Sequence, residues 1–350
     1  MRPINDRLYA WILGLGPSAR YNFTSSGLSE PDLSAMGVDT SFEKFAAEKD
    51  EHARLFAETV ARLYDVEPDN VLITVGASEA IFLVCSVFGT GRRAIVPLPN
   101  YEPMFTVPQS LGMDVGNSLA EIPTVRRAIC GLTDPNNPTG RSLDNGAVKE
   151  TIRSSKKQET LVFVNETYKE FTFPGALSTY FGEADNVIVC STMTKFFGLG
   201  RLRVGWILAD KQKARQLLRA KWLISGHNSE YSLWIATQVL KGRAKFVERA
   251  RKVYSENVEL VRRFIDSTPG ISARGLGAAP FCLVEYGRGP ASISLCRRVF
   301  DSTGVLISPG DFFGAPKAFR LCFTSDRKTL KLGLAKLSDF LNTTLRAART

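Results

Sequence analysis

The chain has 350 residues, of which 44% are hydrophobic, and it carries a formal net charge of +10 at pH 7. This length exceeds that of a typical single domain, so we expect two domains with a sizeable core. No apolar run is long enough to span a membrane. The basic balance suits small anionic ligands, and without a basic block interleaved with aromatic residues we predict no nucleic-acid partner.

The N-terminal stretch "LYAWILGLGPSA", residues 8–19, is a short apolar run that ends in small residues. Its brevity and the nearby Asp6 disfavour a signal peptide. We predict instead a helix that packs on a neighbouring subunit, in a homodimer.

Residues 71–210 alternate between apolar runs of strand length and segments of helical length. The runs are "VLITVG", "RRAIVPLP", "RAICGLT", "TLVFVNE", "NVIVCST" and "RVGWILA". Between them, "SEAIFLVCSVF" has helical periodicity and "LDNGAVKETIRSSKKQ" is polar and helix-like. Such alternation predicts an α/β fold with a mostly parallel sheet between helices. Ligands in these folds bind at the carboxyl ends of the strands.

The pattern changes after residue 210. Residues 211–265 are rich in lysine and arginine and read as long helices. "PFCLVEY", "GVLISPG" and "FRLCF" are short strand-like runs, and a final helix places four leucines on one face: Leu330, Leu334, Leu337 and Leu341. We predict a large α/β domain over 33–244 and a smaller α+β domain that combines 1–32 with 245–350.

Polar and small residues follow the ends of the first predicted strands. Gly76, Ala77 and Ser78 open a helix after "VLITVG", where free backbone N–H groups and the helix dipole favour a phosphate. Tyr101 lies just beyond the next strand, where an aromatic ring stacks on a flat ligand. Asn137 sits in the rigid turn "DPNNPTG", which is far more specific than ordinary turn chemistry.

The following strand ends add more polar side chains: Asn165, Tyr168, Thr192, Thr194, Lys195 and Arg203. Lys195 is the notable member, because it follows a strand and faces a predicted phosphate site. Lysine amines form Schiff bases with aldehydes, and neighbouring positive charge lowers their pKa toward reactivity. The residues alone therefore predict a site for a flat, phosphorylated aldehyde.

These motifs resemble those of the fold-type I pyridoxal-phosphate (PLP) enzymes, the class I/II aminotransferases. The similarity is greatest to the short branch that contains the histidinol-phosphate aminotransferases. It runs in the same order from "GASEA" to "FRLCF", with "DPNNPTG" and "TMTKFFGLGRLRVGW" as its strongest parts.

The resemblance implies a role for each motif residue. Lys195 would form the Schiff base with the cofactor and carry the proton in catalysis. Tyr101 would stack on the cofactor ring, while Asn137 and Tyr168 would bond its phenolic oxygen. Arg320, together with Asn137, would hold the substrate, and the arginine fork would take the α-carboxylate. The residues expected around the cofactor phosphate are Ala77, Ser78, Thr192, Thr194 and Arg203.

Three positions depart from the family pattern. Asn165 stands where the family has an aspartate that pairs with the ring nitrogen, and a neutral amide cannot favour a pyridinium electrostatically. Residues 41–56 lack the tyrosine that reaches the partner subunit's cofactor phosphate; Phe42, Lys44, Phe45, Lys49 and His52 are the candidates to replace it. Arg201 replaces a usual glycine, as either a surface arginine or an extra charge near the cofactor.

The leading interpretation is a PLP-dependent aminotransferase that moves an amino group between an amino acid and a 2-oxo acid, with amino acids that carry an anionic or phosphorylated side chain among the candidate substrates. The alternative is a PLP-dependent lyase or decarboxylase of the threonine-phosphate decarboxylase type, since substrate orientation decides which bond breaks. A ligand-sensing domain of a transcription regulator is a third reading, although no DNA-binding domain fits before the similarity begins.

The remaining expectations concern metals and location. Six cysteines without a Cys-x-x-Cys pair indicate buried free thiols in a reducing compartment, so we predict a cytoplasmic protein. Only two histidines, His52 and His227, are present, which disfavours a histidine-rich metal site. We predict that the site holds no metal.

Overall fold

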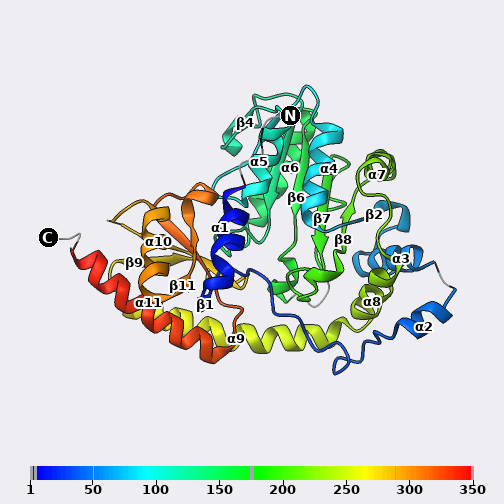
Figure 1. Ribbon diagram of the computed structural model, residues 1–350. Coiled ribbons are helices and arrows are strands. Elements are labelled where there is room, and N and C mark those ends of the chain that lie inside the picture. The colour runs from blue at the N-terminus through cyan, green and yellow to red at the C-terminus, as the bar shows by residue number, and fades with distance from the viewer. Residues whose placement is uncertain (1–2, 4–5, 50, 174–176, 288, 348–350) are drawn as a thin grey trace.

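A seven-stranded sheet forms the centre of the computed structural model, which describes residues 3, 6–49, 51–173, 177–287 and 289–347 (Figure 1). Its strands follow the order β2-β8-β7-β6-β5-β3-β4. Their bounds are β2 Val71–Thr74, β3 Arg93–Ile95, β4 Val115–Gly116, β5 Ala128–Thr133, β6 Leu161–Asn165, β7 Val187–Thr192 and β8 Gly205–Leu208. Only β8 breaks the parallel arrangement, by pairing antiparallel with both β2 and β7. The predicted mostly parallel sheet is therefore confirmed.

Helices cover both faces of this sheet. Every residue of β5, β6, β7 and β8 is buried, which explains why these runs are continuously apolar. One face packs against α4 Ala77–Phe88, α5 Glu102–Ser110 and α7 Lys211–Ile224. The other packs against α3 His52–Tyr64, α6 Asn145–Lys157 and α8 Glu230–Lys241.

A second, smaller sheet has the order β12-β13-β10-β9, beside a two-stranded pair of β1 and β11. These strands are β1 Tyr21–Asn22, β9 Ile271–Arg274, β10 Phe281–Tyr286, β11 Val305–Leu306, β12 Ser308–Pro309 and β13 Ala318–Cys322. Three helices pack on them: α9 Arg243–Ser267, α10 Ser292–Thr303 and α11 Arg327–Ala347. The predicted leucine face of the last helix is buried in this core.

Two features of the smaller part differ in detail from the sequence pattern. The single run "GVLISPG" forms two short strands in different sheets, β11 and β12. Helix α9 contributes Phe246 and Ala250 to the core of the large sheet, and Val261 and Phe264 to the core of the small one. The predicted boundary between residues 244 and 245 falls at the start of this helix and stays a prediction.

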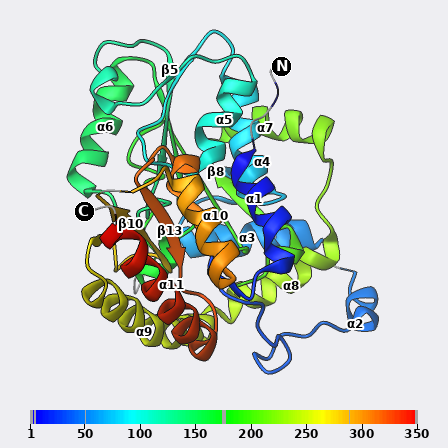
Figure 2. The ribbon, with the colours of Figure 1, turned by 60° about the vertical axis from the view of Figure 1, so that its left-hand side comes forward.

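Helix α1, Arg7–Leu15, packs on its own chain between the two parts of the molecule (Figure 2). Leu8 is buried against Phe312 and Phe313, and its backbone N–H donates to Glu102 Oε2 at 2.7 Å. This face therefore packs within the chain, whereas Leu13 is 72% exposed, and the predicted contact with a neighbouring subunit stays a prediction. Helix α2, Phe42–Ala47, lies at the far end of the large part.

Short 3-10 helices occupy several connections: Gly16–Ser18, Pro68–Asn70, Leu119–Glu121, Lys169–Thr172, Gly200–Leu202 and Gly310–Phe313. Among the described residues, no helix is both long and apolar enough to cross a membrane. All six cysteines are free and buried, as the sequence predicts.

Candidate active site

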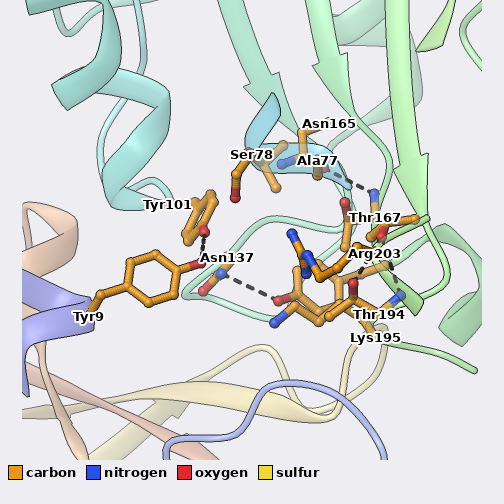
Figure 3. A pocket seen from close by; sticks show the side chains of 13 residues that line it. Tyr9, Ala77, Ser78, Tyr101, Asn137, Asn165, Thr167, Thr194, Lys195 and Arg203 are labelled. Carbon is orange, nitrogen blue, oxygen red and sulfur yellow. Dashed lines mark hydrogen bonds between the residues drawn. The ribbon is translucent and has the colours of Figure 1, made fainter. Parts of the chain in front are cut away.

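A pocket opens at the carboxyl ends of the central strands, with a volume of about 490 Å³ including its mouth (Figure 3). It combines strand-end residues from β5, β6 and β7 with the start of α4 and with Tyr9 of α1. Its lining residues are Tyr9, Ala77, Ser78, Tyr101, Thr133, Asn137, Asn165, Thr167, Tyr168, Thr192, Thr194, Lys195 and Arg203. Ten of the eleven residues singled out from the sequence line it, and Arg320 lies behind it.

The N-terminus of α4 forms one wall of this pocket. Its N-cap is Gly76, which has φ +91° and no side chain to cap the helix, so the first backbone N–H groups stay free for an anion. A Cβ at Gly76 would lie 3.2 Å from Nη2 of Arg203. Nearby, the hydroxyls of Thr192 and Thr194 lie 3.0 Å apart. This corner therefore concentrates hydrogen-bond donors and one positive charge.

Lys195 lies just after β7 and lines the same pocket. Burial, with a smaller contribution from the positive charges of Arg320 and Arg203, lowers its pKa to about 8. The backbone of Lys195 is held from the N-terminal segment, because Leu28 N donates to Lys195 O at 2.8 Å. An amine with this pKa is about half neutral, and therefore nucleophilic, at pH 8, whereas an ordinary lysine is almost fully protonated there.

A buried network joins the pocket to the small sheet. Arg320 on β13 is only 2% exposed, and its Nη1 donates to Asn137 Oδ1 at 2.9 Å. Asn137 Nδ2 in turn lies 3.5 Å from the Tyr168 hydroxyl. Arg320 Nη2 donates to Thr24 O at 2.9 Å, and the guanidinium lies 4.8 Å from the Phe313 ring centroid. These contacts hold the Arg320 guanidinium in a fixed orientation beside Asn137.

Four residues near the site escaped the sequence analysis. Thr133 and Thr167 line the pocket at strand ends, a position that the same strand-end reasoning could have indicated. Tyr9 reaches the pocket from α1, where its hydroxyl lies 2.6 Å from that of Tyr101. Ser26 accepts a hydrogen bond from Tyr168 at 2.9 Å. No local pattern indicates Tyr9 or Ser26, since each is more than ninety residues from its partner.

Comparison with known proteins identifies the family. Residues 41–337 match the model of the family described as aminotransferase class I and II. The chain belongs to the class I and II aminotransferase family. Solved structures share its fold. One of them is a PLP-dependent aminotransferase from Streptococcus suis, which matches with a TM-score of 0.86 at 22% sequence identity. The match covers 96% of this chain and 97% of that one.

Individual relatives of this aminotransferase carry several substrate names. It is 26% identical over 302 residues to histidinol-phosphate aminotransferase 2 of Carboxydothermus hydrogenoformans, covering 80% of this chain and 79% of the relative. It is 23% identical to the aspartate aminotransferase of Pyrococcus horikoshii, covering 71% and 69%. The protein is a PLP-dependent aminotransferase with a fold-type I architecture.

The pocket of this aminotransferase fits PLP in its donor set. The uncapped α4 N-terminus, the Thr192 and Thr194 hydroxyls and Arg203 suit a phosphate, and a Cβ at Gly76 would crowd this group of donors. Lys195 lines the same pocket and would supply an amine for the aldehyde. Among the described residues no group of metal-ligating side chains is found.

The two remaining departures from the family pattern lie away from the pocket of the aminotransferase. Phe45 and His52 pack on each other with ring centroids 5.2 Å apart, and His52 is buried. The Arg201 side chain is 89% exposed and lies 3.4 Å from Glu30. Arg201 is therefore a surface residue in this chain, and it does not line the cofactor pocket.

The lowered pKa of Lys195 predicts how the apoprotein captures PLP. Because only the neutral amine attacks an aldehyde, the capture rate should rise about tenfold per pH unit below pH 8 and then level off. Stopped-flow absorbance after mixing apoprotein with PLP measures this rate. A rate that keeps rising past pH 10, as for an ordinary lysine, would contradict the prediction.

Proposed function

We propose that this aminotransferase transfers the amino group of a substrate with an anionic group to a 2-oxo acid, with Lys195 as its catalytic residue. The observation that supports this proposal is the position of Lys195. Its amine has a pKa of about 8 and lines a pocket whose hydrogen-bond donors suit an anion. Bound PLP supplies an aldehyde carbon for the lysine and an electron-accepting ring for the substrate.

The lining residues have separate tasks in this proposal. Lys195 Nζ would accept the proton from the substrate Cα and hold it for return, because it is the titratable amine in the pocket. Tyr101 covers one face of the cofactor ring. Tyr168 and Asn137 bind the phenolic oxygen, and their mutual contact at 3.5 Å supports this pairing. The proposed phosphate ligands are Ala77, Ser78, Thr192, Thr194 and Arg203.

Charge supports an anionic substrate. No aspartate or glutamate lies among the described lining residues, so no carboxylate there would repel an anionic substrate. Arg320 adds a buried guanidinium that is already oriented by Asn137. Several similar proteins are named histidinol-phosphate aminotransferase, and others aspartate or α-aminoadipate aminotransferase. Each of these names describes a donor that carries a phosphate or a side-chain carboxylate.

A panel of amino donors tests this proposal. Each donor is mixed with 2-oxoglutarate and both products are followed by mass spectrometry, with histidinol phosphate, aspartate and α-aminoadipate against leucine and alanine. We expect paired formation of glutamate and the oxo product from an anionic donor. Release of carbon dioxide or ammonia without glutamate would instead identify a lyase or decarboxylase.

Arg320→Lys tests the substrate anion site. Lysine keeps the charge but loses the planar guanidinium, so KM should rise about ten- to a hundred-fold for all donors that carry an α-carboxylate. Steady-state kinetics measures this change, with Arg297→Lys on the exposed face of α10 as a matched control. A loss confined to one class of donor would contradict the assignment and make Arg320 a specificity residue.

We also propose a homodimer. The α7 helix ends in three consecutive apolar residues that are strongly exposed: Trp222 at 55%, Leu223 at 90% and Ile224 at 53%. Single exposed apolar residues are common, but a contiguous group of this size usually marks a contact surface. Phe42 of α2, 65% exposed, is a second such residue.

Leu223→Asp should convert the dimer to a monomer, because a charge in an apolar contact is left without a partner. Light scattering at micromolar concentration measures the mass. Leu332→Asp is the matched control, since Leu332 is 48% exposed on α11 away from the α7 end. A monomeric mass for the parent protein would refute the homodimer.

We place the enzyme in the cytoplasm, supported by its six buried free thiols.

A further inference from the structure

The amide of Asn165 has a defined orientation. The backbone N–H of Thr167 donates to Asn165 Oδ1 at 3.1 Å. A backbone N–H can only donate, so the atom that faces it must be the side-chain oxygen and not the nitrogen. The Nδ2 group is therefore turned to the opposite side, and Asn165 projects into the pocket in Figure 3.

The surroundings keep this orientation in place. Asn165 is the last residue of β6, paired with Thr133 of β5 on one side and Cys190 of β7 on the other. It is only 3% exposed, and its own carbonyl accepts from Asp134 N at 3.0 Å. A flipped amide would set two donors against each other and leave the buried Thr167 N–H unpaired, which is unfavourable.

No acidic side chain lines the described part of the pocket to compensate for the missing aspartate. Glu166 is adjacent in sequence, but successive strand residues face opposite sides. Its Oε1 accepts from Tyr180 N at 2.7 Å, on the other face of the sheet. Asp134 is likewise engaged, with Lys169 Nζ 2.6 Å from its Oδ2 and Leu143 N 2.8 Å from its Oδ1.

We propose that Asn165 donates a hydrogen bond from Nδ2 to the ring nitrogen of PLP and so holds that nitrogen unprotonated. This inference rests on the proposed function, since it places the ring nitrogen of PLP beside Asn165, the position at which the family has its carboxylate. A protonated ring nitrogen is itself a donor and would face the Asn165 donor directly.

The consequence is a cofactor with weaker electron withdrawal than in a carboxylate-bearing relative. Asn165 acts here as a hydrogen-bond donor that sets the protonation state of the ring, whereas an aspartate would accept a hydrogen bond from a protonated ring nitrogen. Lys195 would then move the substrate proton without help from a charged group beside the ring nitrogen.

Nitrogen-15 NMR of the holoenzyme, loaded with PLP labelled at the ring nitrogen, tests this proposal. The parent protein should give the shift of a neutral pyridine near neutral pH, and Asn165→Asp should move it to the pyridinium range. Asn117→Asp is the matched control, because Asn117 is exposed and outside the pocket, and its spectrum should equal that of the parent.

Two outcomes would overturn the proposal: a pyridinium shift in the parent protein, or an Asn165→Asp spectrum that does not differ from it. The parent spectrum decides even where the variant fails to fold. Failure of the proposed function is separate and visible beforehand, since a protein that does not bind PLP through Lys195 gives no covalent adduct on borohydride reduction.

Discussion

Replacing Lys195 with alanine should reduce the transamination rate by at least about a thousand-fold, because the residue that moves the proton is lost. The variant should also lose the covalent link to PLP, so the absorbance band of the lysine-bound cofactor should disappear. Steady-state kinetics with the best donor and a visible absorbance spectrum measure both effects.

The control for this substitution is Lys211→Ala, which removes an exposed lysine at the start of α7. It should leave the rate and the spectrum unchanged. If Lys195→Ala kept a tenth or more of the parent activity while remaining folded, Lys195 would not be the catalytic residue and the pocket assignment would fail.

Replacing Asn165 with aspartate should raise the single-turnover rate by at least about tenfold, which corresponds to about 1.4 kcal/mol of barrier. Asn165 contributes no charge, whereas a carboxylate at the end of β6 stabilises a positive ring nitrogen and so favours removal of the substrate Cα proton. Stopped-flow measurement of one turnover with a single donor isolates this step from product release.

Asn117→Asp adds the same charge to an exposed site and should leave the single-turnover rate unchanged. A parent protein that is already as fast as Asn165→Asp would contradict the expectation. It would mean that the neutral amide costs this enzyme nothing.

The strands that carry the site were predictable because each is buried on both faces and reads as a continuous apolar run. Asn165, Thr192 and Lys195 could be placed together because parallel strands present their carboxyl ends at one edge. The parallel order itself has an exception in β8, Gly205–Leu208, whose direction depends on the short connection from β7. Local periodicity carries no information on strand direction.

Long-range contacts were not predictable from local patterns. Tyr9 meets Tyr101, and Ser26 meets Tyr168, only because α1 and the N-terminal segment fold back over the pocket. The buried face of α1 was assigned to a partner because an apolar run does not show which surface covers it. The orientation of the Asn165 amide required the position of the Thr167 N–H. Such details depend on tertiary structure.

The proposed function depends most directly on covalent capture of PLP by Lys195. Borohydride reduction of the holoenzyme, followed by peptide mapping with mass spectrometry, locates the lysine that holds the cofactor. We predict a single pyridoxyl adduct on Lys195, in the peptide that contains "STMTKFFGLGR". An adduct on another lysine, or none while PLP remains bound, would contradict it.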